Sequence, residues 1–267
     1  VVSVLISLVG LVVFAVLFGL VVDRVRLSLD AIARGTSEVI ESDHLVVLGW
    51  NDKALLLVRE LSLGLKHKGR ERVAIVVLSL VDKAEVEAEI DAARERGVLA
   101  RSARVIVRTG DPTRRSHLMR AAASSAHTII CLAPPGRDAD AADSSTLRLI
   151  LSIKSLESLA RPFCGNVVAE ICDVDNAPLI RLTGGESVDC VVSHDMIGRL
   201  IALAVCHVNL PSVWDELLAF EGNELLFLRV PPELVGEDFD DVALRFPHAV
   251  ALGVRTRATA SDDATTV

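Results

Sequence analysis

The sequence predicts an α/β protein with an N-terminal transmembrane helix, a doubly wound parallel sheet of Rossmann-like type, and a partial, smaller α+β domain. Three observations predict this organisation. Residues 1–22 carry no charged side chain, apolar runs alternate with helical patterns from residue 44 onward, and the composition shifts again after residue 210. Continuous apolar runs are typical of parallel strands that are covered on both faces.

Residues 1–22 are the predicted membrane span. Seventeen of them are Val, Leu, Ile or Phe, and a helix of this length measures about 33 Å, enough to cross a hydrocarbon core of about 30 Å. A secretory signal would need a basic N-terminal region and a small-residue cleavage site, which are absent here. Basic residues follow the span at Arg24 and Arg26. The positive-inside rule therefore predicts a single span with the C-terminal part of the chain in the cytosol.

Two glycines, Gly10 and Gly19, lie inside the apolar span. Small residues in a membrane helix allow a neighbouring helix to pack closely. The same two glycines are candidates for a gating hinge in a pore-lining helix. The sequence leaves both interpretations open.

Residues 23–43 form the predicted linker between the membrane and the α/β domain. Charged and apolar residues alternate there at near-helical spacing, and Gly35 breaks the pattern. We expect this segment to join two structured parts of the chain.

Residues 44–210 contain the predicted Rossmann-like domain. Its strands are short apolar runs, and the helices between them carry apolar residues at helical spacing. The predicted strands span residues 44–49, 72–80, 104–108, 127–133, 166–170 and 188–193. The predicted helices span residues 52–63, 83–96, 143–159 and 196–208.

Residues 211–257 are predicted to form part of a second domain, which follows a break at Pro211. Apolar runs at 224–230 and 249–255 flank a helical pattern at 238–246, which indicates a β-α-β fragment. The tail at 258–267 is polar and is predicted to be disordered.

The turn after the first strand is an altered dinucleotide-binding loop, with the sequence GWNDKA at 49–54. The fingerprint G-x-G-x-x-G/A needs a middle glycine so that a pyrophosphate reaches the backbone, and Asn51 replaces it. Ser79 stands near the end of the second strand, where an acidic residue would hold the ribose. The sequence therefore disfavours NAD. Gly49, Asn51 and Asp52 remain candidates for contact with another small ligand or ion at the helix N-terminus.

A second candidate lies after the third strand, where the chain has Gly110-Asp111-Pro112. This position is at the carboxyl edge of the sheet, which is the ligand side of a doubly wound fold. Asp111 is expected to cap the following helix, which Pro112 would open. Gly110 and Asp111 are also candidates for a ligand contact.

Carboxylates gather after the fifth strand at Glu170, Asp173 and Asp175. They are candidates for binding a divalent cation such as calcium, which prefers oxygen ligands. A solvated loop or a contact between subunits is the alternative. A second acidic run at 237–241 lies at a predicted helix start, where the helix dipole stabilises carboxylates without a metal.

The composition argues against several classes of function. A net charge of -8 and an aromatic content of 3% disfavour nucleic-acid binding. The five cysteines form no CxxC pair, so neither a zinc site nor a disulfide framework is predicted. Ser193, His194 and Asp195 are adjacent in sequence, whereas catalytic triads are assembled in space. We expect no catalytic residues and no enzyme.

Several motifs resemble a known family. The run Gly110-Asp111-Pro112-Thr113, with Leu118 and Ala121 after it, resembles the RCK (TrkA-N) domains that gate potassium channels. Six further segments resemble the CASTOR/POLLUX ion channel family: FAVLFGLVVD at 14–23, GTSEVIE at 35–41, HLVVLGWNDK at 44–53, FEGNE at 220–224, ELVG at 233–236 and RFPHAV at 245–250. The resemblance covers nearly the whole chain.

The resemblance implies a homo-tetrameric cation channel whose cytosolic domains form a gating ring. Residues 1–22 would then be the pore-lining inner helix, and 23–43 would transmit force from the ring to the pore. Residues 44–210 would be an RCK domain of the N-terminal type, and 211–257 part of the C-terminal type. The family's selectivity filter lies upstream of this helix, so the chain is expected to be an internal fragment.

Two functions remain open from the sequence. The chain is the inner helix and gating-ring part of a ligand-gated, potassium- or calcium-permeable channel, or it is a membrane-anchored regulatory subunit of a separate ion transporter. The expected partners are further copies of the chain, membrane lipid and permeant cations, but not nucleic acid. We expect the plasma membrane, with the nuclear envelope, to which CASTOR and POLLUX belong, as the alternative.

Overall fold

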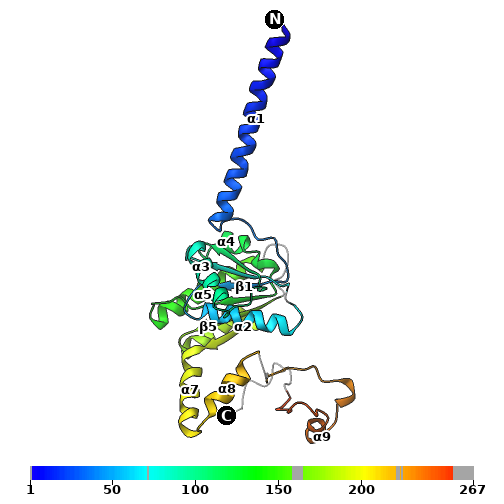
Figure 1. Ribbon diagram of the computed structural model, residues 1–267. Coiled ribbons are helices and arrows are strands. Elements are labelled where there is room, and N and C mark those ends of the chain that lie inside the picture. The colour runs from blue at the N-terminus through cyan, green and yellow to red at the C-terminus, as the bar shows by residue number, and fades with distance from the viewer. Residues whose placement is uncertain (1, 71, 158–164, 221–222, 224, 255–267) are drawn as a thin grey trace. The chain divides into compact units, whose positions relative to one another are not determined.

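A parallel sheet organises the chain. The computed structural model describes residues 2–70, 72–157, 165–220, 223 and 225–254, and for residues 2–9 it describes the backbone alone. Six strands form the sheet in the order β3-β2-β1-β4-β5-β6. Figure 1 shows this sheet with helices packed around it. The strands are β1 (Leu45–Leu48), β2 (Ile75–Ser79), β3 (Val105–Thr109), β4 (Thr128–Cys131), β5 (Asn166–Ile171) and β6 (Val188–Val192). The order reverses between β1 and β4, as in a doubly wound sheet, so the predicted α/β fold is confirmed.

Helices cover both faces of this sheet. The helices α2 (Ala54–His67) and α3 (Lys83–Glu95) pack on one face, and α4 (Arg115–Arg120), α5 (Ala139–Glu157) and α6 (Ala177–Gly184) pack on the other. The short helices η1 (Ala123–Ser125), η2 (Val174–Asn176) and η3 (Gly185–Ser187) connect them to the strands. A helix was expected after Pro112, and α4 lies there, beginning at Arg115. The helix α6 was not predicted, because eight residues are too few to show a helical period.

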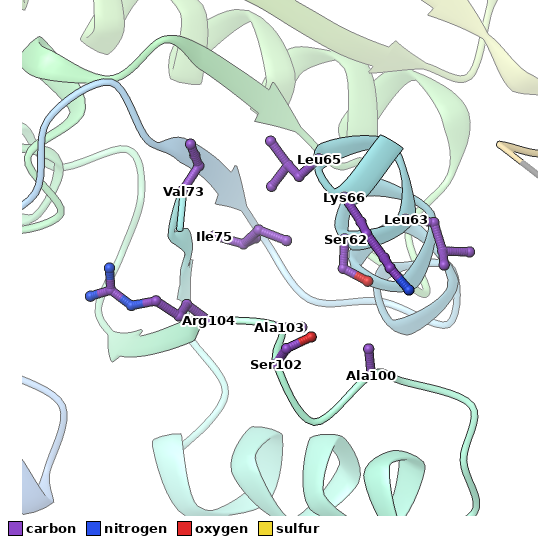
Figure 2. Close-up of a pocket in the computed structure, with 10 residues that line it drawn as sticks. All are labelled: Ser62, Leu63, Leu65, Lys66, Val73, Ile75, Ala100, Ser102, Ala103 and Arg104. Atoms are coloured by element: carbon purple, nitrogen blue, oxygen red, sulfur yellow. The ribbon is translucent and has the colours of Figure 1, made fainter. Parts of the chain in front are cut away.

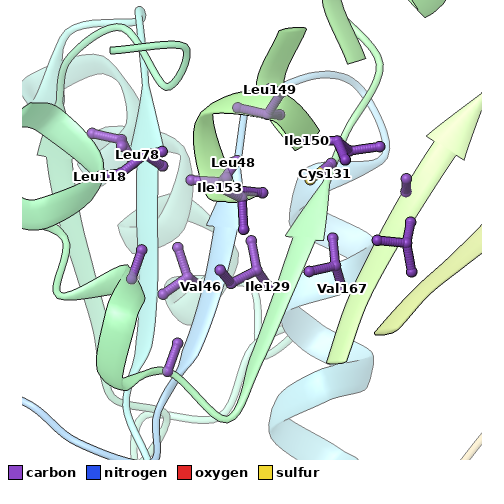
Figure 3. Packing of buried hydrophobic residues seen from close by; sticks show 14 of the residues in the cluster. Val46, Leu48, Leu78, Leu118, Ile129, Cys131, Leu149, Ile150, Ile153 and Val167 are labelled. Atoms are coloured by element: carbon purple, nitrogen blue, oxygen red, sulfur yellow. The ribbon is translucent and has the colours of Figure 1, made fainter. Parts of the chain in front are cut away.

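The core lies in two clusters, one on each face of the sheet. Alternate residues of a strand point to opposite faces, so Val46 and Leu48 of β1 belong to one cluster and Val47 to the other. In the first cluster, Leu118 of α4 and Ile153 of α5 pack against these strand residues (Figure 3). The strands are therefore apolar along their whole length because both of their faces are buried.

The first helix extends beyond the predicted span and into the predicted linker. Helix α1 (Val2–Ala33) is continuous, and Gly35 follows it with a φ of 69°, which favours glycine. Among the residues whose side chains are described, no helix is both long and apolar enough to cross a membrane. The side chains of residues 1–9 of the predicted span 1–22 lie outside that part of the chain.

After α1 the chain lies against β3, which is an edge strand of the sheet. We call residues 34–43 the strap. The carbonyl oxygen of Gly35 accepts a hydrogen bond from the Thr109 backbone over 3.1 Å, and the Val39 backbone donates to the Arg120 carbonyl over 2.8 Å. Val39 is buried in the core. The predicted linker is therefore partly helix and partly a strap fixed to the domain.

Two helices follow the sheet. They are α7 (Ser193–Cys206) and α8 (Leu210–Leu218), and Pro211 lies in the first turn of α8. The sequence predicts a break at Pro211, and this prediction is wrong, because α8 includes the proline. Proline is favoured in the first turn of a helix because its missing N–H needs no partner there.

The chain divides into two compact units after residue 224. The domain boundary expected at 210 stays a prediction. The second unit contains η4 (Pro232–Leu234) and α9 (Phe239–Leu244), which lies within the helix predicted at 238–246. Residues 225–230 and 249–254 form no strand, so the predicted β-α-β fragment is wrong over the described residues. Leu226 and Leu252 of these two segments are exposed, whereas strand-forming residues are favoured on a half-buried, pleated surface. The tail predicted at 258–267 lies outside the described residues.

Candidate functional site

Residues at the end of β5 and just after β1, β4 and β6 meet at the carboxyl edge of the sheet, beside the point where the strand order reverses. We call this group the switch-point cluster. It consists of Gly49, Asn51, Lys53, Ala133, Glu170 and Ser193. Three of these residues were singled out from the sequence, and Lys53, Ala133 and Ser193 were not.

Gly49 makes the tight turn that the sequence predicts. Its φ is 100°, and a Cβ atom at this position would lie 3.3 Å from the carbonyl oxygen of Leu132. A side chain would therefore strain the backbone and crowd the start of the β4–α5 loop. The turn retains the first glycine of a dinucleotide-binding loop.

Asn51 lies where that loop would need a second glycine. Its side-chain Nδ2 donates to the carbonyl oxygen of Ala133 over 3.0 Å, and its Oδ1 accepts from the backbone N–H of Lys53 over 3.0 Å. The Asn51 side chain thus bridges two loops, and it occupies the backbone N–H of Lys53, which lies beside the start of α2. A pyrophosphate at this loop would need that N–H and that space, and the absence of NAD binding stays a prediction. Asp52, the other candidate in this turn, is exposed.

Glu170, at the end of β5, is paired with a cation. Its Oε1 accepts a hydrogen bond from Lys53 Nζ, and its Oε2 accepts from the backbone N–H of Ala133 over 3.0 Å. Burial alone would raise the pKa of Glu170. The hydrogen bonds from Lys53 and Ala133, together with the lysine charge, outweigh burial and lower that pKa below its usual value. Glu170 is therefore ionised at neutral pH.

The other two carboxylates of the predicted cation site are used differently. Asp173 accepts a hydrogen bond from the Asp175 backbone over 3.0 Å, which closes the turn at η2. Over the described residues, no three His, Cys, Asp or Glu side chains are placed to hold a metal ion together. Glu170, Asp173 and Asp175 are thus not a preformed metal site, and cation binding by them stays a prediction that this geometry does not favour.

A buried carboxylate that the sequence analysis missed organises the same loop. Asp143 of α5 accepts hydrogen bonds from the backbones of Cys172 and Asp173, over 2.8 and 3.0 Å, and from the side chain of Asn176 over 2.9 Å. Asp143 fixes the loop after β5 and so the position of Glu170. Its contacts lie about thirty residues away in sequence, and no local pattern marked it.

Asp111 was expected to cap the following helix, but it closes the turn after β3. Its Oδ1 accepts from the backbone and hydroxyl of Thr113, over 2.9 and 2.7 Å, and its own N–H donates to His117 Nδ1 over 2.8 Å. Burial by itself raises the pKa of Asp111. The hydrogen bonds from Thr113 and the charge of Arg114 lower this pKa by more than burial raises it, so the net shift is downward. Helix α4 begins only at Arg115, so Asp111 caps the turn and not the helix.

Gly110 precedes this turn and packs against the same histidine. A Cβ atom on Gly110 would lie 2.8 Å from His117 Nδ1. The strand β3 is four positions from β5 in the sheet, which is about 19 Å at the usual strand spacing. Asp111 and Glu170 therefore do not contact one small ligand together.

A small cavity lies at the opposite, amino-terminal edge of the sheet (Figure 2). It is lined by the end of α2, including Lys66, and by the loop before β3, including Arg104. The Arg104 guanidinium donates to the Arg72 carbonyl over 3.1 Å and to Glu41 over 2.7 Å. The Arg104 charge is thus paired with Glu41 of the strap. The cavity lies at the edge of the sheet opposite the predicted ligand edge.

The glycines of the predicted hinge lie within the continuous helix α1. A Cβ atom at Gly10 or at Gly19 would meet no other atom within 4 Å. The gating hinge at these glycines stays a prediction.

Comparisons with known proteins point to ion channels. A family model described as calcium-activated potassium channel slowpoke-like RCK domain matches residues 41–182. A second model, described as Castor and Pollux, part of voltage-gated ion channel, matches residues 194–262.

Curated plant proteins are similar over almost the whole chain. The probable ion channel POLLUX of Arabidopsis thaliana is 38% identical over 258 residues, which are 97% of this chain and 30% of the relative. The probable ion channel CASTOR of Oryza sativa subsp. japonica is 37% identical over 254 residues, 95% of this chain and 27% of the relative. The chain thus spans less than a third of the length of these relatives.

A solved structure of the human SLO3 gating ring is similar at a greater distance. It has a TM-score of 0.43 and 18% sequence identity, over 70% of this chain and 31% of that chain.

Proposed function

Because the chain belongs to the CASTOR/POLLUX ion channel family and contains its RCK domain, we propose that it couples a gating ring to the pore of a ligand-gated cation channel. The family is one of ion channels and not of enzymes. On this proposal, residues 44–210 belong to the ring, and residues 1–22 are the inner helix that lines the pore.

The attachment of the strap to β3 is the observation that carries the proposal. Gly35 and Ser37 bind the carboxyl-terminal end of β3 through backbone and side-chain hydrogen bonds. Lys83 at the start of α3 donates to the Ile32 carbonyl at the end of α1 over 2.8 Å. A movement of the sheet edge would therefore pull directly on the end of α1, with little slack in between.

The described side chains of α1 support its proposed place in a membrane. Leu11, Phe14 and Leu20 are about two-thirds exposed, at 65%, 66% and 62%. Large apolar side chains stay exposed at a cost unless lipid or another protein covers them. In the proposed channel, lipid and the inner helices of the other subunits cover this surface.

Four copies would form the ring, and a ligand would act at the carboxyl edge of the sheets. The ligand is not identified, and a divalent cation such as calcium is the candidate to test first. Asp111 and the switch-point cluster lie at this edge, within or beside the loops that a bound ligand would move. The plasma membrane is the proposed location.

The experiment is cation flux through the purified full-length protein in liposomes. We expect potassium or calcium flux that changes when calcium is added on the side of the RCK domain. Flux that does not respond to calcium would support the channel function and exclude calcium as the gating ligand. The absence of flux would contradict the channel and favour a regulatory subunit that acts on a separate transporter.

A further inference from the structure

Glu170 connects three separate elements through one carboxylate. Lys53 reaches it from the β1–α2 turn, and the Ala133 N–H reaches it from the β4–α5 loop. Lys53 Nζ also lies 3.4 Å from the hydroxyl of Ser193, the first residue of α7. The start of α7 is therefore tied to the same point as the two loops at the reversal of strand order.

The helix α7 continues directly from β6, and over the described residues few other contacts join it to the sheet. None of its residues is buried, and its ion pair, between Asp195 and Arg199, lies within the helix. Apolar burial normally fixes a helix to its sheet. Because α7 has no buried apolar residue, we expect the polar contacts of its first turn to contribute an unusually large part of what holds α7 to the sheet.

The two members of the ion pair differ in their exposure. The side chain of Lys53 is 54% exposed, and that of Glu170 is 9% exposed. Solvent or a competing anion can reach the lysine and draw it away, whereas the carboxylate stays in place. Departure of the lysine would leave the buried carboxylate of Glu170 without a counter-charge, and this cost favours re-formation of the ion pair.

We propose that Lys53 and Glu170 form a latch that holds the first turn of α7 against the carboxyl edge of the sheet. Opening of the latch frees α7 and, with it, the chain that continues into the second unit. The latch is a property of this chain alone and does not depend on the proposed channel function. If that function holds, the latch links the loops of the ligand edge to the segment that leaves the RCK domain.

The test is hydrogen–deuterium exchange, followed by mass spectrometry, on the full-length protein without ligand. In Lys53→Met we expect amides of residues 193–200 to exchange about threefold faster, together with those of 133–136, because the pair is partly exposed and modest in strength. Helix α3 is expected to exchange at the native rate. Lys53→Arg keeps the positive charge and is expected to restore most of the protection.

Two further variants separate the latch from general effects. Arg199→Met removes the ion pair within α7 and is expected to loosen α7 without changing residues 133–136. Lys53→Met combined with Glu170→Gln removes the buried charge, so it is expected to fold even if the single variant does not, and still to free α7. Unchanged exchange of residues 193–200 in the double variant would overturn the latch, whatever the flux experiment shows.

Discussion

Arg108 of β3 donates from Nε to the carbonyl oxygen of Ser37 over 2.8 Å, although the two residues lie 71 positions apart. This contact joins the edge strand to the strap. Burial lowers the pKa of Arg108, and the nearby Glu87 charge opposes that shift. The guanidinium still carries its charge at any physiological pH, because its ordinary pKa is so high. The strap is therefore held by a charge-assisted hydrogen bond as well as by backbone contacts.

Arg108→Ala is expected to loosen the strap. The loss of a hydrogen bond from a charged group should lower the free energy of unfolding by about 1 to 2 kcal/mol, measured by urea unfolding. Residues 34–43 should become more sensitive to protease. Arg94→Ala is the matched control, since Arg94 also donates to a backbone carbonyl, at Ala103 over 3.0 Å, but not to the strap. Equal protease sensitivity of the strap in both variants would contradict the assignment.

Gly49→Ala is expected to destabilise the domain by about 1 to 3 kcal/mol, because the positive φ disfavours any side chain. Thermal unfolding of the purified protein checks this. Gly198→Ala, in the exposed helix α7 with open space around it, is the control and should be neutral or stabilising by up to about 1 kcal/mol. If the two substitutions have the same effect, the β1–α2 turn is not strained.

The ionised form of Glu170 is expected to contribute stability that depends on pH. Its pKa is lowered in the folded state, so the contribution is complete above the ordinary glutamate pKa of about 4.3 and is lost as the pH falls through the lower, folded value. The stability difference between the native protein and Glu170→Gln should therefore shrink below pH of about 4. A difference that stays constant from neutral pH to acid would show that Lys53 does not hold the carboxylate in its charged form.

NAD at millimolar concentration is expected to leave the melting temperature unchanged, because Asn51 takes the Lys53 N–H and bridges to Ala133. Asn51→Gly removes this obstacle and serves as the comparison. A stabilising shift in the native protein would contradict the prediction. A shift in the variant alone would identify Asn51 as the residue that excludes the dinucleotide.

The sheet was predictable because its strands are buried on both faces and so appear as uninterrupted apolar runs. The turns at Gly49 and Asp111 were predictable from local residue types, since a positive φ favours glycine and Asp111 accepts its hydrogen bonds from Thr113, two residues away. The second unit was not predictable in this way. Its apolar runs at 225–230 and 249–254 have the composition of strands, but composition does not supply a partner strand.

The site was less predictable than the fold. Glu170 was found as a carboxylate at the ligand edge and as a candidate for cation binding, but its pairing with Lys53 was not predicted, because the two residues lie 117 positions apart. Asp143 was missed for the same reason. In both cases the topology of the sheet, and not any sequence pattern, brings the groups together.

The most direct test of the proposed coupling is the open probability of single channels formed by the full-length protein in a lipid bilayer. It compares the native strap with a strap lengthened by a short run of glycines after Ser37. We predict that the inserted slack leaves the single-channel conductance unchanged, shifts the basal open probability and abolishes any response to calcium. Identical open probability and calcium response in the two proteins would contradict the account, since the strap would then transmit nothing from the RCK domain to α1.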